Sequence, residues 1–266
     1  MTAALTAARP LVGVSLKLYM GVARSAAWLR EVAALASDRE EQLSRLDLFV
    51  LPSFTSLSDA GRLLRGTRVG FGGQDVHWAD EGPWTGEVSA PQLAETGAAY
   101  AEIGHAERRR HFGESEEVTR AKTAAATRAG LIPVICAGDD AEHDAGAAVE
   151  QTLRQARAAL DGAAPGSEVV LAYEPVWAIG AERSAPPDRV REVTAAVRDC
   201  LDGYPVHGRI LYGGTAGPGT FTELRAHGAP VDGLFLGRRA HDPTGLGKVL
   251  DEMDPPPGTC EPEEER

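Results

Sequence analysis

The sequence has little that would favour a disulfide-linked, membrane-spanning or nucleic-acid-binding protein. Only three of its 266 residues are cysteines, too few and too widely spaced for a disulfide framework or a zinc site. No run reaches the roughly 18 apolar residues that a membrane helix requires, and residues 1–10 lack the apolar block of a signal peptide. Lys and Arg number 27 against 39 Asp and Glu, with no basic stripe to neutralise nucleic-acid phosphates. We therefore expect a cytoplasmic protein without metal, nucleic-acid or membrane partners.

The formal charge of −12 is concentrated at one end of the chain. Residues 251–266 contain seven acidic residues and a single Arg, interrupted by a Pro-Pro-Pro-Gly run. Such a composition cannot bury enough apolar surface to fold. We expect residues 254–266 to form a disordered, acidic, Pro-rich tail and residues 1–10 to form a flexible N-terminal extension.

Short apolar segments alternate with helical segments through the rest of the chain. The strands are expected at residues 11–17, 46–51, 67–74, 100–104, 131–136, 168–173, 209–212 and 231–236. The helices are expected at residues 23–36, 57–64, 90–95, 116–129, 145–160, 187–201 and 244–253. Residues 76–89 are expected to form a long loop, and a charged turn should follow residue 104. The alternation predicts a single-domain (β/α)8 barrel over residues 11–253.

Three residues suited to proton transfer or anion binding are expected at strand ends. The apolar segment 168–173 leads into Glu174, where Pro175 ends the strand. Lys17 closes the first strand and His105 follows the fourth. Each alone is more simply a structural or surface residue, but the carboxyl ends of all strands in such a barrel meet at one mouth. A carboxylate, an imidazole and an ammonium group that meet there form an acid–base set.

Two glycine turns follow the last two strands. Gly213-Gly214-Thr215 follows the seventh strand, and Gly237-Arg238 follows the eighth. Barrels of this type often bind phosphate at this place through backbone N–H groups. We therefore expect a small phosphorylated substrate, because a local site can attract an anion in an acidic protein.

Four motifs give the chain a resemblance to a known family. They are Gly104-His105-Ala106-Glu107-Arg108-Arg109, Ala172–Gly180, Tyr212-Gly213-Gly214 and Thr85-Gly86-Glu87-Val88-Ser89. Together they resemble the triosephosphate isomerases over about residues 12–250, which implies a TIM barrel. The resemblance further implies an aldose–ketose isomerase that works through an enediolate and needs no cofactor.

The resemblance also implies roles for individual residues. Glu174 is implied as the base, His105 as a neutral electrophile, Lys17 as the substrate-binding cation and Glu107 as a nearby carboxylate. The neutral histidine and the closing lid are established for triosephosphate isomerase itself. The implied substrate-binding residues are Ser15, Gly180, Gly214, Thr215, Gly237 and Arg238. The implied lid residues are Pro175, Val176, Trp177, Ala178, Ile179, Ala181 and Glu182.

The loop at residues 76–89 has two interpretations. It is either a surface loop that packs on itself or, as the resemblance implies, a loop that inserts beside the active site of a second subunit. The residues at its tip are Trp84, Thr85, Gly86 and Glu87. We expect the second arrangement and hence a homodimer.

Four residues depart from the family pattern. Ser15 replaces a longer Asn, Ala106 replaces a Ser whose hydroxyl would meet Glu174, and Glu182 and Arg238 replace glycines. Ser15, Arg238 and residues 76–80 resemble a branch that isomerises tetrulose phosphates in erythritol breakdown.

Two substrates therefore remain open. We rank first the interconversion of dihydroxyacetone phosphate and glyceraldehyde 3-phosphate, a step of glycolysis and gluconeogenesis, and second the tetrulose-phosphate reaction. A non-catalytic phosphosugar-binding barrel ranks lower, because it would need no base such as Glu174. An aldolase ranks lower as well, because it would need a Schiff-base lysine inside the barrel or a metal.

Overall fold

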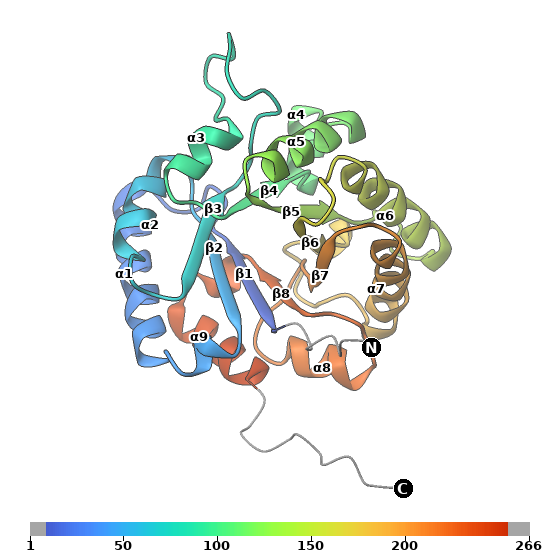
Figure 1. Ribbon diagram of the computed structural model, residues 1–266. Coiled ribbons are helices and arrows are strands. Elements are labelled where there is room, and N and C mark those ends of the chain that lie inside the picture. Colours follow the sequence, from blue (N-terminus) through green and yellow to red (C-terminus); the bar gives the residue numbers. More distant parts are fainter. Residues whose placement is uncertain (1–8, 255–266) are drawn as a thin grey trace, which may run out of the picture.

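Eight apolar segments form one parallel sheet, which closes on itself in the computed structural model (Figure 1). The strands are β1 Leu11–Ser15, β2 Asp47–Leu51, β3 Val69–Gly73, β4 Tyr100–Ile103, β5 Ile132–Ala137, β6 Glu168–Tyr173, β7 His207–Tyr212 and β8 Gly233–Leu236. Leu11 of β1 pairs with Asp47 of β2 on one side and with Gly233 of β8 on the other, which closes the barrel. The expected (β/α)8 barrel is confirmed.

The structure describes residues 9–254. Most of the expected N-terminal extension and all but the first residue of the expected tail lie outside this range. Asp254, the first residue of the expected tail, accepts hydrogen bonds from Arg45 at 3.0 and 2.8 Å and is thus held against the barrel.

Helices surround the sheet on its outer face (Figure 1). They are α1 Val22–Asp38, α2 Leu57–Leu63, α3 Ala90–Glu95, α4 Ala106–Phe112, α5 Glu116–Arg128, α6 Ala145–Leu160, α7 Pro187–Asp202, α8 Thr220–Ala226 and α9 Pro243–Met253. Four 3₁₀ turns accompany them, η1 Gln42–Ser44, η2 Phe54–Ser56, η3 Val176–Ala178 and η4 Arg238–Ala240. On α7, Val190, Val193 and Val197 recur at helical spacing and are buried against the sheet. Within residues 9–254, no helix has the length and apolar character needed to cross a membrane.

The barrel interior is packed by alternating large and small residues. Phe49 of β2 stacks on Tyr100 of β4 with ring centroids 4.2 Å apart, and it lies 6.1 Å from the ring of Phe235 on β8. A Cβ atom on Gly13 of β1 would lie 2.3 Å from the Phe49 ring, and one on Gly72 of β3 would lie 2.0 Å from the Tyr100 carbonyl oxygen. The glycines thus allow the backbone and the aromatic rings to approach closely inside the barrel.

Two short helices were missed in the sequence. The expected charged turn after β4 is the helix α4, which buries none of its residues and so shows no apolar periodicity. His105 caps its N-terminus, and Gly113 ends it in the left-handed conformation with φ 69°. The other missed helix, α8, is only two turns long and follows a glycine N-cap, so its sequence carries no start signal.

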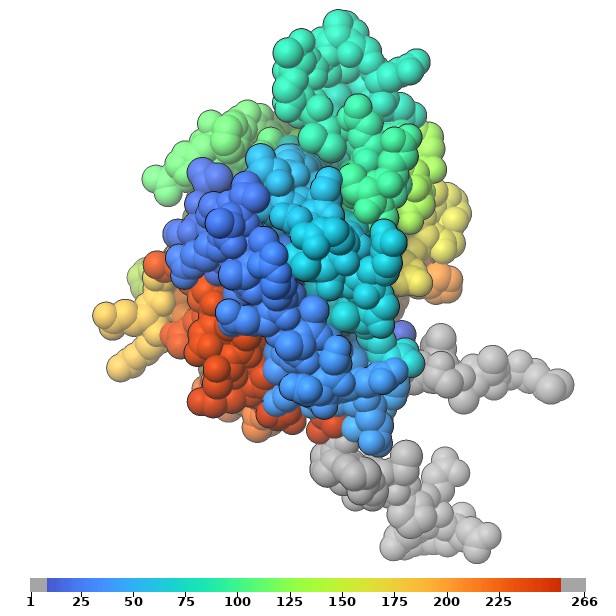
Figure 2. Space-filling view, turned by 90° about the vertical axis from the view of Figure 1, so that its left-hand side faces the viewer, coloured from blue at the N-terminus to red at the C-terminus, as the bar shows by residue number. Residues whose placement is uncertain are grey.

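The loop at residues 76–89 projects from the body of the barrel, as Figures 1 and 2 show. His77 lies under two indoles, with ring centroids 4.1 Å from Trp78 and 4.6 Å from Trp84. Arg128 of α5 donates to both carboxylate oxygens of Asp80 at 3.2 and 2.7 Å. The loop is thus irregular, as expected, yet anchored at its base.

Barrel closure makes a direct prediction about Gly233. A Cβ atom there would lie 1.7 Å from the Leu11 carbonyl oxygen, so Gly233→Ala should cost about 3 kcal/mol or more in stability. Calorimetry should show a Tm lowered by roughly 6–12 °C for a chain of this size. Gly146→Ala is the matched control, because Gly146 lies in α6 with only ordinary contacts around its Cβ position. An unchanged Tm for Gly233→Ala would contradict the tight β1–β8 closure.

Candidate active site

The carboxyl ends of the strands bring the expected catalytic residues to one mouth. Ser15 ends β1 and Lys17 follows two residues later, His105 follows β4, and Glu174 follows β6. The Gly214-Thr215 turn follows β7, and Gly237 and Arg238 follow β8. The site therefore depends on five strands that are far apart in the sequence.

Lys17 is held in a conformation that is costly for a side-chain-bearing residue. Its φ is 48°, in the left-handed region, and Gln74 stabilises this turn by donating hydrogen bonds to the carbonyl oxygens of Lys17 at 3.0 Å and Leu51 at 2.9 Å. Its Nζ donates to Glu107 Oε1 at 2.8 Å. Burial lowers the pKa of Lys17, but Glu174 and Glu107 raise it by more, so the net pKa lies above its usual value. Lys17 is therefore a firmly charged ammonium group.

His105 is oriented by the helix that it caps. Its Nδ1 accepts the backbone N–H of Glu107 at 3.1 Å, so Nδ1 carries no proton and the imidazole carries its proton on Nε2. Nε2 lies 3.4 Å from Glu174 Oε2. Neither atom has a hydrogen-bond partner among the described residues, although both are buried. A buried donor and a buried carboxylate oxygen therefore await partners from a ligand.

Glu174 occupies a space that two glycines leave open. A Cβ atom on Gly213 of the β7 turn would lie 2.5 Å from Glu174 Cγ, and one on Gly138, after β5, would lie 1.9 Å from the Glu174 carbonyl oxygen. Ala106 and Glu174 border the same cavity of about 490 Å³. As the sequence predicts, Ala106 offers no hydroxyl to the carboxylate. The side chain of Glu174 thus has room to move but no hydrogen bond to hold it.

The segment expected to be the lid begins directly after Glu174. It forms the turn η3, and Trp177 Nε1 donates to Asp139 Oδ1 at 3.2 Å while Tyr173 donates to Oδ2 at 2.9 Å. On the other side, Thr215 Oγ1 donates to the carbonyl oxygens of Ala178 and Ala181 at 2.9 and 3.0 Å. Asp139 was missed in the sequence because its partners lie 34 and 38 residues away.

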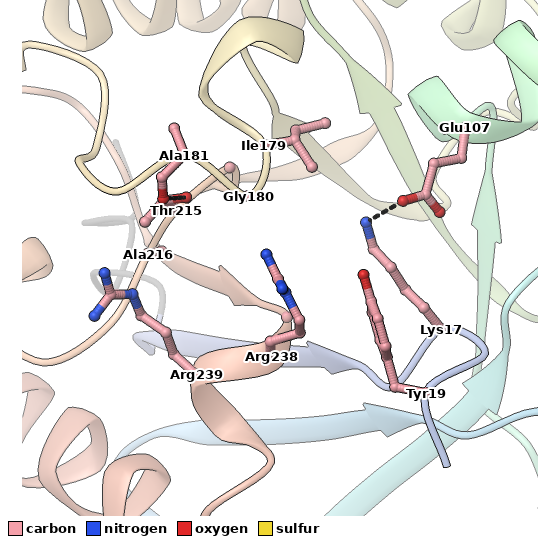
Figure 3. Close-up of a pocket in the computed structure, with 12 residues that line it drawn as sticks. Lys17, Tyr19, Glu107, Ile179, Gly180, Ala181, Thr215, Ala216, Arg238 and Arg239 are labelled. Atoms are coloured by element: carbon pink, nitrogen blue, oxygen red, sulfur yellow. Dashed lines mark hydrogen bonds and ion pairs between the residues drawn. The ribbon is translucent and has the colours of Figure 1, made fainter. Parts of the chain in front are cut away.

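A second cavity of about 490 Å³ lies between the lid and the turns after β7 and β8 (Figure 3). The residues expected to bind substrate that line it are Lys17, Gly180, Gly214, Thr215, Gly237 and Arg238. Arg238 rises toward the lid, with its guanidinium 5.7 Å from the centre of the Tyr19 ring. Its Nη2 lies 3.1 Å from where a Cβ on Gly180 would be. Arg238 therefore adds a positive charge where a glycine would leave the backbone exposed.

Arg239 and Tyr19 also line this cavity and were missed in the sequence. Arg239 Nη2 donates to the carbonyl oxygen of Glu182 at 3.4 Å and so reaches the lid. Arg239 was not predicted, because two consecutive arginines after a strand are equally typical of an exposed basic turn. Glu182 itself lies outside the cavity lining and borders a groove beside Pro186.

Glu102 is a further polar residue that was missed. It points from β4 into the top of the barrel interior with only 3% of its surface exposed. Ser15 Oγ donates to its Oε2 at 2.9 Å, and Cys136 Sγ lies 3.9 Å from its Oε1. Burial raises the pKa of Glu102 to about 7, although the hydrogen bond from Ser15 and the charge of Lys17 act in the opposite direction. Glu102 could have been found from the sequence, because it is an acidic residue in an otherwise apolar strand, two residues before Gly104.

The loop-tip residues lie away from these cavities. Trp84, Thr85 and Glu87 line a separate hollow against α4 and α5, and none of the loop borders the space next to Lys17 or Glu174. Within one chain the structure thus does not bring the expected dimer loop to the active site. Among residues 9–254, no group of His, Cys, Asp or Glu side chains is arranged to hold a metal ion.

The comparisons with known proteins agree with this geometry. The family model described as triosephosphate isomerase matches residues 10–253. The L-erythrulose-1-phosphate isomerase of Pectobacterium atrosepticum is 43% identical over 247 residues, which cover 91% of this chain and 94% of the relative. The enzymes of the same name from Mesorhizobium japonicum and Mycolicibacterium smegmatis are each 38% identical, covering 90% and 93% of this chain and 95% and 94% of the relatives.

These relatives correct one expectation. The sequence ranked the triose phosphate reaction first, and that ranking is wrong, because these relatives carry the name of a four-carbon ketose phosphate. The expected role in glycolysis and gluconeogenesis depended on that ranking and is withdrawn as well. The ranking failed because the acid–base set is shared by both reactions, whereas one carbon of substrate length leaves only small traces in the sequence. The family match, the closed barrel and the relatives together show that this chain belongs to the triosephosphate isomerase family and is an aldose–ketose type isomerase of a sugar phosphate.

Proposed function

We propose that the protein isomerises a tetrulose phosphate, L-erythrulose 1-phosphate, with Glu174 as the base. The observation that supports it most is the similarity, across 90% or more of the chain, to relatives named L-erythrulose-1-phosphate isomerase. The mouth of the barrel supports the chemistry, because His105 Nε2 and Glu174 Oε2 lie 3.4 Å apart beside the charged Lys17. The expected role in erythritol breakdown is part of the same proposal.

The substrate's own chemistry limits where the carbonyl group can move. In L-erythrulose 1-phosphate the carbonyl is at C2, C1 carries the phosphate ester and C3 carries a free hydroxyl. An enediolate with two oxygens can therefore form only between C2 and C3. Removal of the C3 proton and its return to C2 moves the carbonyl to C3, and the product is again a tetrulose phosphate with the phosphate at the other end. The reaction uses the same enediolate chemistry as an aldose–ketose isomerase. It interconverts two ketoses, because the carbonyl group moves between two carbons inside the chain.

Each residue at the mouth has a matching task in this shift. Glu174 takes the proton from C3 and later returns it to C2. The Nε2–H of His105 and the ammonium of Lys17 stabilise the charge that develops on the C2 and C3 oxygens. One more proton passes from the C3 oxygen to the C2 oxygen, and His105 Nε2 is placed to relay it. Both orphaned polar atoms of the ligand-free site then gain partners.

The phosphate belongs in the cavity between the lid and the last two strand ends. Backbone N–H groups of Gly180, Thr215 and Gly237 surround this cavity, and Arg238 adds a guanidinium that suits phosphate oxygens. Lys17 and Arg238 make the site locally positive although the whole chain carries −12. Closure of the lid over the enediolate would exclude water and suppress loss of the phosphate group.

A non-catalytic binding barrel is less well supported. A binding module gains nothing from a buried carboxylate oxygen and a buried imidazole N–H that both lack hydrogen-bond partners, since each costs stability. A reacting substrate gives both of them a use. No observation on the structure favours an aldolase.

Assays of both substrates side by side test the proposed reaction. The kcat/KM for L-erythrulose 1-phosphate should exceed that for dihydroxyacetone phosphate, and Glu174→Gln should lower kcat on the four-carbon substrate at least about 10³-fold by removing the base. His105→Gln should lower kcat more than it raises KM. Thermal melts of all variants check that they fold. Turnover of the triose phosphate alone, or full activity of Glu174→Gln, would refute the assignment.

Arg238 gives a separate test of the phosphate site. Arg238→Gly should raise KM for the tetrulose phosphate about tenfold, because one charge-assisted hydrogen bond is lost. The inhibition constant for inorganic phosphate, which has no carbon chain, should rise in parallel. The preference between four- and three-carbon substrates should also change, because the arginine narrows the cavity. Unaltered phosphate inhibition together with an unaltered preference would remove Arg238 from the site.

We also propose that the protein is a homodimer joined through the loop at residues 76–89. The loop projects from the barrel with exposed Trp78 and Trp84, and further exposed apolar residues are Leu18, Tyr19, Val22 and Phe54. Burying them in a second copy would remove apolar surface from water.

Sedimentation can check this arrangement directly. The wild-type protein should sediment as a dimer at micromolar concentration, and Thr85→Asp should shift it toward the monomer by placing an unpaired charge in the interface. Glu117→Gln on the exposed start of α5 is the control and should leave the dimer intact. A wild-type monomer at micromolar concentration would sink the proposal.

A further inference from the structure

The carboxyl group of Glu102 lies inside the barrel without an ion-pair partner. Among the described residues no Lys, Arg or His nitrogen lies within 4.0 Å of it, and its hydrogen-bonding neighbours are Ser15 and Cys136. A buried acid with so little compensation costs stability compared with an apolar residue of the same size. Packing alone therefore does not explain why an acid occupies this position, and we expect a functional role for Glu102.

The hydrogen bond to Glu102 fixes the direction of the Ser15 hydroxyl. Ser15 has a single hydroxyl hydrogen, and it is donated to Glu102 Oε2 at 2.9 Å. Only the lone pairs of the Ser15 oxygen remain for any other partner. Ser15 lies at the carboxyl end of β1, two residues before Lys17. A donor has therefore been converted into an acceptor next to the catalytic mouth.

The oxygens of the substrate differ in what they need. The C2 and C3 oxygens become carbonyl or enediolate oxygens during the shift and require donors, which Lys17 and the Nε2–H of His105 supply. The C4 oxygen remains a hydroxyl throughout and has a hydrogen to donate. Glu174 is occupied with the carbon-bound proton, and Glu107 is engaged by Lys17 at 2.8 Å. The Ser15 oxygen keeps lone pairs that can accept a hydrogen bond from this hydroxyl at the barrel end.

Space for the additional carbon lies next to this cluster. Cys136, whose thiol contacts Glu102, borders the cavity of about 490 Å³ that Glu174 and Ala106 also line. Ser15 and Glu102 are themselves buried and do not line this cavity. Cys136 lies between the cavity and Glu102, so a hydroxymethyl group beyond the reacting carbons would approach the Ser15–Glu102 pair from the Glu174 side.

We propose that Glu102 is a positioning residue for substrate specificity, which orients the Ser15 hydroxyl to accept a hydrogen bond from the terminal C4 hydroxyl of a tetrulose phosphate. This inference rests on the proposed function. It explains why an acid and a short serine occur together in this barrel interior, since neither would recognise the hydroxyl alone.

The arrangement tolerates a change in the charge of Glu102. Burial raises the pKa of this carboxyl to about 7, so both protonation states occur near neutral pH. The titratable groups that face it are Lys17 after β1, His105 after β4 and Glu174 after β6, with the Cys136 thiol on β5. The carboxylate can only accept, so it fixes the Ser15 hydrogen, and the same orientation is kept in the protonated state when the proton lies on Oε1.

Three variants test the proposal on the full-length enzyme. Ser15→Ala and Glu102→Leu should each lower kcat/KM for L-erythrulose 1-phosphate about tenfold, mainly through KM, because one hydrogen bond to the substrate is lost. The double variant should be no worse than Ser15→Ala. Glu102→Gln keeps an oxygen acceptor for Ser15 and should recover most of the loss. Ser56→Ala is the matched control, because Ser56 is equally buried but its hydroxyl has no partner.

A second measurement separates recognition from structural damage. The inhibitor 2-phosphoglycolate carries a phosphate and an enediolate-like carboxylate but no terminal hydroxymethyl group. Its inhibition constant should change less than threefold in Ser15→Ala and Glu102→Leu. Equal losses for inhibitor and substrate, additive effects in the double variant, or no recovery in Glu102→Gln would each overturn the role of Glu102. A wild-type enzyme without activity on the tetrulose phosphate would instead refute the proposed function itself, and the inference with it.

Discussion

The active site depends on one hydrogen bond, from the backbone N–H of Glu107 to Nδ1 of His105. It places the imidazole proton on Nε2 and aims it at Glu174. The same first turn of α4 presents the Glu107 side chain to Lys17, whose backbone is left-handed. A single helix start thus sets the proton position of His105 and places a carboxylate beside the Lys17 ammonium group.

Glycines in the barrel provide the space that this arrangement requires. Gly138 and Gly213 leave the space in which Glu174 lies, and any Cβ atom there would collide with it. Conversely, the interior below is filled by aromatic rings such as Phe49 and Tyr100. The mouth is polar and open because the floor beneath it is packed, and closure of the sheet is what brings both together.

Much of this could be predicted from the sequence, and for physical reasons. Apolar strands followed by Pro, Gly or charged residues define the barrel, and the rule that strand ends meet at one mouth places Lys17, His105 and Glu174. The short helices escaped prediction, because α4 buries no residue and α8 has no capping side chain. Glu102 escaped because its meaning comes from Ser15 and Cys136, which lie 87 and 34 residues away. The two candidate substrates were ranked in the wrong order. They differ by one carbon, and no sequence motif identifies that difference.

The unpaired atoms of His105 and Glu174 have a consequence for the stability of the protein. The ligand-free fold bears the cost of two buried polar atoms without partners, and a bound sugar phosphate removes it. Any ligand that binds only the folded state raises resistance to unfolding by mass action, by about 2.7 kcal/mol at a hundredfold excess over Kd. The folded protein is therefore more resistant to unfolding when its sugar phosphate is bound than when the site lacks it.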